Sequence, residues 1–374
     1  MPAGPSVVVV GAGAFGGWTA LHLRRRGARV TLLDAFGPGN SRASSGGETR
    51  IIRALYPDRI YVRMTARALD LWREFQALRG LELLHRTGFL RFVSADDPLI
   101  ERAPAFFAEA GMPLEVYTPG EASRRFPQVY FGGVDCVLLD PSAGWLPARR
   151  CCALVAETLI AEGGEYRETE ATPGAIDGGA MHSVTLRDGS VLAADCFVFA
   201  CGPWMGRVFP DAIGDRIRAL RREVCFFGTP AGDRSFDGPG MPCWGDNIEH
   251  FYGVPGNEWR GFKVGEERLT IPFDPTSGDR TPSPEAHAEI RRYLAFRFPA
   301  LGDAPLVESR VCQYESTADA HLIVDRHPRA ANVLLAGGGS GHGFKLGPAV
   351  GELAAQMLLE GAAAPLDLSL SRPR

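Results

Sequence analysis

The first 34 residues follow the pattern of a strand, a glycine-rich turn, a helix and a second strand. Residues 7–10 are four consecutive valines, and an unbroken β-branched run is typical of a strand buried on both faces. A helix is expected from the turn to about Arg26, where Gly27 can end it. Residues 29–33 form a second apolar strand. This order predicts a β–α–β unit of a parallel sheet covered by helices.

The glycines of the turn follow the GxGxxG pattern at Gly11, Gly13 and Gly16. In a β–α–β unit the first permits a tight turn, the second lets backbone approach a pyrophosphate, and the third lets the helix pack on the strand. N–H groups at the helix N-terminus favour the phosphates. Asp34 ends the second strand, where it can bind a ribose hydroxyl. The sequence therefore predicts a dinucleotide site; a purely structural turn is the alternative.

This pattern does not by itself distinguish NAD from FAD. A nicotinamide enzyme usually continues the doubly wound sheet, whereas this chain continues with a Gly- and Ser-rich loop that contains Arg42, Arg50 and Arg53. A second glycine-rich stretch, GGGSGHGFKLGPAVGE, occupies residues 337–352. We expect these distant segments to meet around one large cofactor, which favours FAD.

The C-terminal glycine stretch follows an apolar strand and precedes an apolar helix, with Pro348 in the first turn of that helix. Backbone N–H groups at glycines and at a helix N-terminus stabilise negative charge. A flavin ring becomes electron-rich on reduction, so bare backbone of this kind suits its edge. A flexible surface loop is the alternative.

Composition and charge restrict the functional classes. The chain has 374 residues, of which 45% are hydrophobic and 22% charged, as in ordinary soluble globular proteins, and its length suggests two domains. A net charge of −4 indicates neither nucleic-acid binding nor binding to an anionic membrane. No apolar run is long enough to predict a membrane span, and no signal peptide is read at the N-terminus.

The eight cysteines are scattered and show no CxxC spacing, so neither a zinc site nor a disulfide framework is expected. No metal site is predicted, and a reduced, cytoplasmic protein is expected. Cys151 and Cys152 are interpreted as core residues of a helix. The last residues, 369–374, are expected to fray.

Four segments resemble the monomeric sarcosine oxidase group of FAD-dependent amine oxidases, within the larger D-amino-acid-oxidase-like family. They follow the family's order over nearly the whole chain: VVVVGAGAFGG, SSGGETRIIR, GFKVG, and VCQYESTADAHLIVDRHP followed by LLAGGGSGHGFKLGPAVGE. The last segment is the most specific. The resemblance implies an FAD-dependent amine oxidase and leaves the identity of the amine open.

The resemblance also implies which residues hold FAD. The N-terminal glycines and Asp34 would bind its ADP half, and Gly338 to Lys345 would wrap the pyrimidine edge of the ring. Cys312 matches the cysteine that holds the flavin 8α-methyl as a thioether; without the resemblance, a lone cysteine is more often a small buried hydrophobe. The implied cofactor-binding residues are Gly11, Gly13, Ala14, Phe15, Gly16, Asp34, Ser44, Ser45, Thr49, Arg50, Ala200, Gly202, Trp204, Cys312, Gly338, Gly339, Gly341, His342, Gly343 and Lys345.

Five residues are implied to act on the substrate or on oxygen: Lys263, Arg53, Lys345, Tyr252 and Glu267. Arg53 and Lys345 would bind a substrate carboxylate, since arginine offers a bidentate fork and lysine a point charge. Lys263 matches the lysine that promotes reaction with oxygen, and Tyr252 matches an active-site tyrosine. A surface position for Arg53, an exposed strand position for Lys263 and a core position for Tyr252 are the structural alternatives.

Three positions leave the substrate chemistry open. Sarcosine oxidases of the family carry histidine where this chain has Gly46, and histidine where it has Glu267. An acid in place of a base changes the shape and charge beside the substrate, so the resemblance leaves open whether sarcosine itself is a substrate. His342 could act as a base, although a packed residue that bonds to backbone is favoured.

The expected fold is α/β, or α+β overall: a Rossmann-like FAD-binding domain with an interleaved antiparallel-sheet substrate domain. Residues 1–85, 145–215 and 305–374 are assigned to the FAD-binding domain, and residues 86–144 and 216–304 to the substrate domain. The resemblance suggests a monomer.

The expected function is oxidation of the C–N bond of a secondary amine or amino acid that bears a carboxylate, with O2 reduced to H2O2. One alternative is an FAD dehydrogenase with another acceptor, or a biosynthetic tailoring oxidase of a cyclic imino acid. A flavin-binding protein without turnover is a further alternative.

Overall fold

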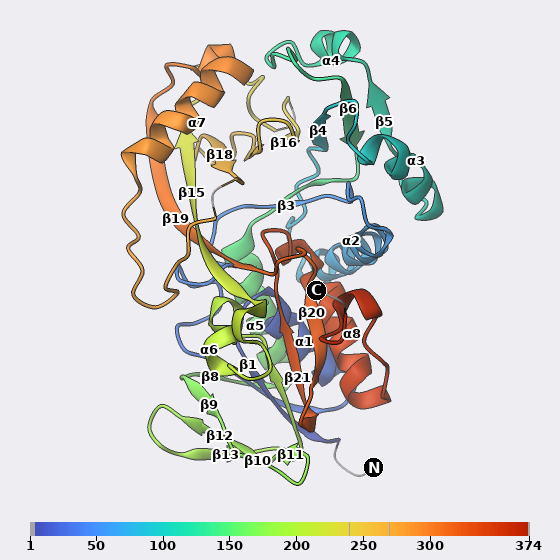
Figure 1. Cartoon of the computed structure of the whole chain (residues 1–374), viewed down its shortest axis with the longest axis vertical. Helices are drawn as coiled ribbons and strands as arrows, with labels where there is room; N and C mark the ends of the chain where they lie inside the picture. The colour runs from blue at the N-terminus through green and yellow to red at the C-terminus, as the bar shows by residue number, and fades with distance from the viewer. Residues whose placement is uncertain (1–3, 239, 269, 373–374) are drawn as a thin grey trace.

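The computed structural model describes residues 4–238, 240–268 and 270–372. The described chain forms two halves, each built on one large sheet (Figure 1). The six-stranded sheet lies in the lower half of Figure 1 and the eight-stranded sheet in the upper half, and the chain passes repeatedly between them. The predicted fold class, with a parallel Rossmann-like sheet and a mostly antiparallel second sheet, is confirmed.

The six-stranded sheet begins with the valine run, whose residues 7–10 are all buried. Its strands are parallel except for the antiparallel pair of β20 and β21. In sheet order they are β20 (Ile323–His327), β21 (Ala330–Gly337), β14 (Cys196–Phe199), β1 (Ser6–Val10), β2 (Arg29–Asp34) and β8 (Glu165–Glu168).

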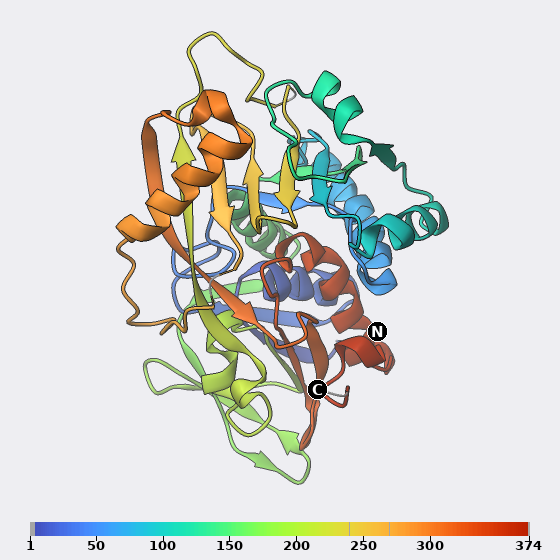
Figure 2. The ribbon, with the colours of Figure 1, turned by 45° about the horizontal axis from the view of Figure 1, so that its top comes forward.

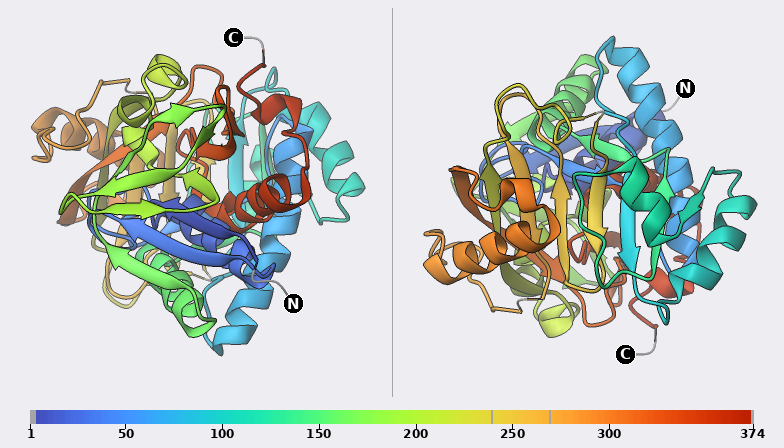
Figure 3. Two further views of the ribbon diagram at one scale, coloured as in Figure 1. Left: turned by 90° about the horizontal axis from the view of Figure 1, so that it is seen from below. Right: turned by 90° about the horizontal axis from the view of Figure 1, so that it is seen from above.

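Helices cover one face of this sheet and small sheets cover the other (Figure 3, left). The helices are α1 (Ala14–Arg25), α5 (Ala148–Ala161) and α8 (Gly347–Glu360), with α2 (Arg59–Arg79) packed outside them. A Cβ on Gly351 would lie 2.6 Å from the carbonyl carbon of Trp18, so glycine there lets α8 approach α1 closely. The opposite face carries β9 (Ala171–Pro173), β10 (Ile176–Asp177), β11 (Ala180–Met181), β12 (Ser183–Leu186), β13 (Val191–Ala193) and α6 (Met205–Val208).

The eight-stranded sheet is antiparallel except where β16 runs parallel to β4. In sheet order its strands are β19 (Leu306–Ser316), β15 (Arg218–Phe227), β18 (Phe262–Glu266), β17 (Phe251–Val254), β16 (Cys243–Asp246), β4 (Phe89–Val93), β6 (Cys136–Asp140) and β5 (Glu115–Tyr117). A two-stranded sheet of β3 (Arg50–Ile52) and β7 (Gly144–Leu146) lies between the halves.

Side chains alternate between the two faces of the eight-stranded sheet. On the outer face, Leu90, Trp244 and Val264 join a core closed by α4 (Pro119–Arg125) and α7 (Pro284–Arg297), which cover the sheet in Figure 3, right. The third helix of this half, α3 (Leu99–Glu109), follows β4. The inner face, directed at the six-stranded half, carries polar side chains, and these form the site described below.

The division into an FAD-binding domain and a substrate domain stays a proposal. Strand β19, which the proposed ranges place in the FAD-binding domain, is hydrogen-bonded along β15 in the eight-stranded sheet. Figure 2 shows these two long strands reaching from one half of the molecule into the other. Residues 1–3, 239, 269 and 373–374 of the proposed ranges lie outside the described residues.

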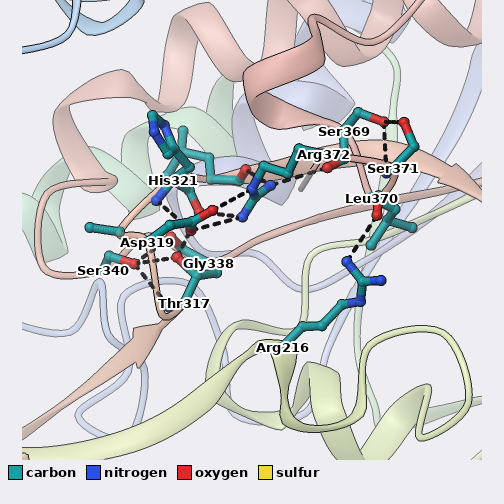
Figure 4. A network of polar contacts seen from close by, with 12 residues as sticks. Arg216, Thr317, Asp319, His321, Gly338, Ser340, Ser369, Leu370, Ser371 and Arg372 are labelled. Carbon is teal, nitrogen blue, oxygen red and sulfur yellow. Dashed lines mark hydrogen bonds and ion pairs between the residues drawn. The ribbon is translucent and has the colours of Figure 1, made fainter. Parts of the chain in front are cut away.

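The expected fraying of the C-terminal segment is wrong as far as Arg372 (Figure 4). Ser369 and Leu370 both donate to Asp325 Oδ2, at 2.7 and 2.8 Å. Arg372 donates to Asp319 at 2.7 Å. The segment looks solvent-exposed in sequence because its acidic partners lie 44 or more positions earlier. The last two residues of the chain lie outside the described residues.

Candidate active site

The glycine turn after β1 packs too closely for side chains. Gly11 adopts a φ of 107°, and its N–H donates to the Leu33 carbonyl at 2.7 Å. A Cβ on Gly11 would lie 2.3 Å from the Ala200 carbonyl oxygen, and one on Gly16 would lie 1.8 Å from that of Gly11. Glycine is therefore required at both positions for α1 and β14 to meet β1.

A cavity opens at the carboxyl ends of β1, β2 and β14 and extends to β19 and the glycine-rich loop after β21. This is the edge at which open α/β sheets bind their ligands. Most residues that the sequence assigned to the cofactor line this cavity. They are Gly11, Gly13, Ala14, Phe15, Asp34, Ser44, Ser45, Arg50, Ala200, Gly202, Trp204, Gly339, Gly341 and Gly343.

Six assigned residues are not part of this lining: Gly16, Thr49, Cys312, Gly338, His342 and Lys345. Several other residues of the lining were missed by sequence reasoning. Among them are Phe36, Thr169, Pro203, Tyr314, Glu315 and Phe344. Tyr314 lies two residues after Cys312 in a strand, so the period-two alternation could have placed both on one face.

Asp34 lies at the end of β2, and both oxygens of its carboxylate accept hydrogen bonds from backbone N–H groups. Its Oδ2 accepts from the N–H of Ala12 at 2.7 Å, and its Oδ1 accepts from the N–H of Phe36 at 2.9 Å. Burial raises the pKa of Asp34, and these backbone donors partly offset that rise. The bonds fix the carboxylate at the cavity wall, where it can accept from a ligand hydroxyl.

The glycine-rich loop folds over β19. Gly338 and Gly341 have positive φ values of 73° and 79°, and a Cβ on Gly341 would lie 2.5 Å from the Tyr314 ring. The loop is tied down because the Ser340 N–H donates to the Glu315 carbonyl at 2.9 Å. Figure 4 shows Ser340 bonded to Thr317, in the network that ends at the C-terminal segment.

Two buried oxygen atoms at the cavity have no hydrogen-bond partner among the described residues, namely Ser44 Oγ and Glu315 Oε2. Burial raises the pKa of Glu315 to about 7, and the N–H groups of Gly338 and Gly339 act in the opposite direction. Buried polar atoms are normally paired. Their lack of protein partners therefore indicates that a polar ligand bonds to them.

Lys263 extends from the inner face of β18 and is only 3% exposed. Its ammonium group donates to the Thr49 carbonyl at 3.1 Å and lies 3.4 Å from the Thr49 hydroxyl. Burial, followed by the charge of Arg50, lowers the pKa of Lys263 to about 7. The exposed strand position considered from the sequence is thus wrong.

Arg53 and Lys345 meet around the ring of Tyr56. The guanidinium carbon of Arg53 lies 4.5 Å from the ring centroid, and the ammonium nitrogen of Lys345 lies 5.2 Å from it. Lys345 is 3% exposed and donates to the His342 carbonyl at 2.9 Å. Burial and the charge of Arg53 lower the pKa of Lys345 well below its usual value. The half-buried Arg53 and the buried Lys345 thus face one small region, where two such side chains can pair with an anion.

A simple count could have singled out both lysines. The sequence contains 40 lysines and arginines together, but only two lysines, Lys263 and Lys345. Both are buried, whereas arginine supplies the surface cations. Lysine differs from arginine because burial can shift its pKa into the neutral range. Because the sequence contains lysine at these two buried positions only, we infer that both lysines have a functional role.

His342 is a packed residue rather than a free base. Its Nδ1 shares a hydrogen bond with the Tyr56 hydroxyl at 3.1 Å, and its Nε2 lies 2.9 Å from the Ala320 carbonyl. Burial, followed by the charge of Lys345, lowers the pKa of His342 to about 3. With both ring nitrogens engaged, the residue orients Tyr56.

Tyr252 and Cys312 lie close to Lys263 on the inner face. The Tyr314 hydroxyl donates to the Tyr252 hydroxyl at 3.2 Å, and Lys263 Nζ lies 6.0 Å from the Tyr252 ring centroid. Cys312 is a free, half-buried cysteine opposite Arg222 in the β15–β19 ladder. Cys312 lies two residues before Tyr314 in β19, and so on the same face of that strand, and its charge when ionised would raise the pKa of Lys263.

The two departures from the family pattern have different physical settings. A Cβ on Gly46 would lie 1.8 Å from the Asn40 carbonyl oxygen, so the backbone of this loop accepts no histidine at that position. Glu267 follows β18 and is exposed, with its N–H bonded to the His250 carbonyl at 2.8 Å. Its negative charge still raises the pKa of Lys345, so Glu267 belongs to the rim of the cation site.

The residues present fit FAD. A nucleotide would lie over the backbone of the turn from Gly11 to Phe15, and Asp34 would meet its ribose. The glycine-rich loop would meet the flavin edge, close to the unpaired oxygens of Ser44 and Glu315. In the described part of the chain, no group of three or more His, Cys, Asp or Glu side chains could hold a metal ion. No helix among the described residues is both long and apolar enough to cross a membrane.

Comparison with known proteins identifies the family. The model of the DAO family, described as FAD dependent oxidoreductase, matches residues 6–357. The peroxisomal sarcosine oxidase of Mus musculus is 29% identical, with 92% of this chain and 90% of that protein covered. The monomeric sarcosine oxidase of Bacillus sp. (strain B-0618) is 28% identical, with 95% of this chain and 92% of that protein covered.

Solved structures share the fold. L-proline dehydrogenase from P. horikoshii superposes with a TM-score of 0.84 at 23% identity, over 97% of this chain and 95% of that chain. Fructosyl peptide oxidase from E. terrenum superposes with a TM-score of 0.83 at 23% identity, over 99% of this chain and 93% of that chain. The family match over nearly the full length agrees with the glycine-lined cavity and its unpaired oxygens. The chain is therefore an enzyme that belongs to the DAO family of FAD-dependent oxidoreductases.

Proposed function

We propose that this enzyme oxidises the C–N bond of a secondary amine or amino acid that bears a carboxylate, of the N-methyl amino acid or imino acid type. The product is an imine that hydrolyses in water, and O2 is reduced to H2O2. The observation that carries the proposal is the meeting of Arg53 and Lys345 around Tyr56. The names of the relatives, two of them sarcosine oxidases, support it.

Arg53 and Lys345 bind the substrate carboxylate. Both are held by backbone carbonyls, of Leu55 and His342 respectively, so their positions are fixed before the substrate arrives. Lys345 is buried and Arg53 is half-buried, which strengthens their attraction for an anion, because charges interact more strongly away from water. A bound carboxylate also restores the charged state of Lys345, whose pKa burial lowers. The carboxylate therefore fixes the orientation of the amine.

FAD, when bound, supplies the acceptor for the two electrons and the hydrogen lost from the carbon next to nitrogen. Its holders are the lining residues of the cavity, and Cys312 is proposed to attach it as a thioether. No side-chain base is needed if the amine binds in its neutral form, which agrees with a His342 whose nitrogens are both engaged. Lys263 provides a buried positive charge that stabilises the negative charge developing on oxygen.

A second candidate function is a dehydrogenase with another acceptor, or a tailoring oxidase of a cyclic imino acid. Glu267 at the rim of the cation site favours it, because a carboxylate there suits a substrate with an additional cationic or hydrogen-bonding group.

We further propose a monomer in a reduced cytoplasmic compartment. Gel filtration with light scattering tests the first proposal, and localisation of a tagged chain tests the second.

Oxygen consumption and dye reduction separate the two candidates. The purified enzyme is supplied with a panel of N-methyl amino acids and cyclic imino acids, and peroxide is measured beside the reduction of an artificial electron acceptor. The proposal expects one H2O2 for each amine consumed, at a rate at least equal to that with the dye. Dye reduction without oxygen consumption would favour the dehydrogenase instead.

A further inference from the structure

Arg91 is a buried charge in a strand that is otherwise apolar. It lies in the middle of β4, whose sequence is FLRFV, and is 5% exposed. Its neighbours Leu90 and Phe92 enter the outer core. Arg91 and Phe89 point to the inner face, toward the six-stranded half.

The sheet makes room for this side chain with a glycine. Arg91 is opposite Gly245 in the parallel pair of β4 and β16. A Cβ on Gly245 would lie 2.6 Å from Arg91 Nη1, so the arginine lies across the bare backbone of the neighbouring strand. It reaches Asn247, which follows β16, and Arg91 Nη1 donates to Asn247 Oδ1 at 2.6 Å.

The partners of Arg91 position it without neutralising it. Asn247 is uncharged, and its Nδ2 donates in turn to Asp97 Oδ2 at 2.6 Å. Arg91 Nε is buried and has no hydrogen-bond partner among the described residues. No carboxylate of the residues that the structure describes lies within ion-pair distance of Arg91. Burial, followed by the charge of Arg53, lowers the pKa of Arg91 to about 9.

Arg91 belongs to the same site as the two proposed carboxylate-binding cations. The guanidinium carbons of Arg91 and Arg53 lie 4.9 and 5.4 Å from the centroid of the Phe89 ring. Arg53 and Lys345 in turn share the ring of Tyr56. Three cations thus follow one another along two aromatic rings, and an unpaired buried charge is costly unless a ligand pairs with it.

One substrate carboxylate can be shared by Arg53 and Lys345, and it leaves Arg91 without an anion. Among the described residues, Glu267 is the carboxylate whose charge acts on both Lys345 and Arg91, and it lies exposed at the rim. We propose that Arg91 is a specificity-determining residue that binds a second carboxylate of the substrate, so that the natural substrate is a dicarboxylic secondary amine or amino acid. This inference rests on the function proposed above.

Binding of redox-inert acids to the holoenzyme tests this inference without turnover. Dissociation constants are measured from the change in flavin absorbance for succinate and glutarate, and for butyrate and valerate as monoacids of matched length. The wild-type enzyme is expected to bind the diacids at least 10-fold more tightly. Arg91→Gln should remove this preference and change monoacid binding by less than about twofold. Arg91→Lys should keep part of the preference, and the exposed Arg124→Gln is the matched control.

A charge swap gives a second variant that retains Arg91. In Asn247→Asp combined with Asp97→Asn, the net charge and the hydrogen-bonded chain are preserved, but a carboxylate now meets Arg91 Nη1 directly. Because Arg91 is then neutralised by the protein, the preference for diacids should fall as it does in Arg91→Gln. A swapped enzyme that keeps the full preference would overturn the inference.

Turnover then separates failure of this inference from failure of the proposed function. N-methylglutamate, N-methylalanine and an N-methylornithine carrying a cation in place of the second carboxylate are compared in anaerobic reduction of the flavin. Preference for the first supports the inference. If N-methylglutamate and N-methylalanine reduce the flavin equally well, or if the N-methylornithine is preferred, the inference is overturned while amine oxidation remains supported. Reduction by no amine, with Arg91-dependent diacid binding retained, contradicts the proposed function alone.

Discussion

The ammonium group of Lys263 donates a hydrogen bond to the backbone carbonyl of Thr49 at 3.1 Å, across 214 positions of the chain. Lys263 comes from the inner face of β18 in the eight-stranded sheet, and Thr49 directly precedes β3. Both residues are buried. This contact joins the two halves of the molecule beside the cavity, and it holds the lysine where burial controls its charge.

Replacement of Lys263 should slow the reaction with oxygen and spare the reaction with substrate. Lys263→Met is expected to lower the rate constant for reoxidation of the reduced flavin by about 100-fold, since one preorganised charge contributes on this scale. Anaerobic reduction by substrate should change by less than about threefold. Stopped-flow absorbance measures both steps, with Lys263→Arg as the variant that keeps the charge. Equal slowing of both steps would contradict the assigned role.

The pH dependence of the oxygen reaction follows from the lowered pKa of Lys263. The charge is complete at low pH and is lost as pH rises through about 7, so reoxidation should slow over that range and become independent of pH in Lys263→Met. With only two lysines in the chain, NMR of the Nζ groups after 13C-methylation can assign the titration directly. A Lys263 signal that titrates near 10 would contradict this account.

Loss of either cation around Tyr56 should weaken binding of carboxylated substrates. Arg53→Met and Lys345→Met are each expected to raise the dissociation constant by about 100-fold, or about 3 kcal/mol, as for truncation of one partner of a buried charge pair. The anaerobic flavin spectrum reports binding. The methyl ester of the same substrate is the control, because it lacks the charge. Unchanged affinity for the acid in both variants would mean that the carboxylate binds elsewhere.

Acid precipitation tests the thioether at Cys312. Flavin absorbance should stay with the wild-type pellet and move to the supernatant in Cys312→Ala. Cys136→Ala, another half-buried free cysteine, should behave as wild type. Flavin released from the wild-type protein would rule out the attachment and leave the family assignment intact.

Gly46 should be intolerant of any side chain. Because a Cβ there would lie 1.8 Å from the Asn40 carbonyl, Gly46→Ala should lower the free energy of unfolding by about 1–3 kcal/mol. The control is Gly120→Ala in α4, where the nearest atom, the end of the Arg124 side chain, lies 3.9 Å away. Urea denaturation compares the two. A Gly46→Ala protein as stable as wild type would show that the loop rearranges freely.

The parts of the molecule that depend on local sequence were predictable. The valine run, the glycine spacing and the terminal Asp34 define β1, α1 and β2 within 34 residues. The glycine-rich stretch before α8 is equally local. Each of these carries its own periodicity or its own steric requirement, so no knowledge of distant partners is needed to interpret it.

The substrate side could be predicted only in part because it is assembled by strand pairing. Arg91 reaches the site through the register of β4 with β16, more than 150 positions later, and Gly245 gives it space. Tyr56 acquires its role only when α8 and its preceding loop bring Lys345 to the ring. A local pattern in FLRFV shows an arginine in a strand, but not the face to which it points or what lies there.

Anaerobic mixing of the purified enzyme with an N-methyl amino acid and with its methyl ester shows whether the enzyme oxidises amines through recognition of their carboxylate. The amino acid should bleach the flavin absorbance fully, and the ester should do so about 100-fold less efficiently or worse. Admitted oxygen should then restore the band with formation of H2O2. Flavin that no carboxylated amine reduces, or that acid and ester reduce equally well, would contradict the proposed function.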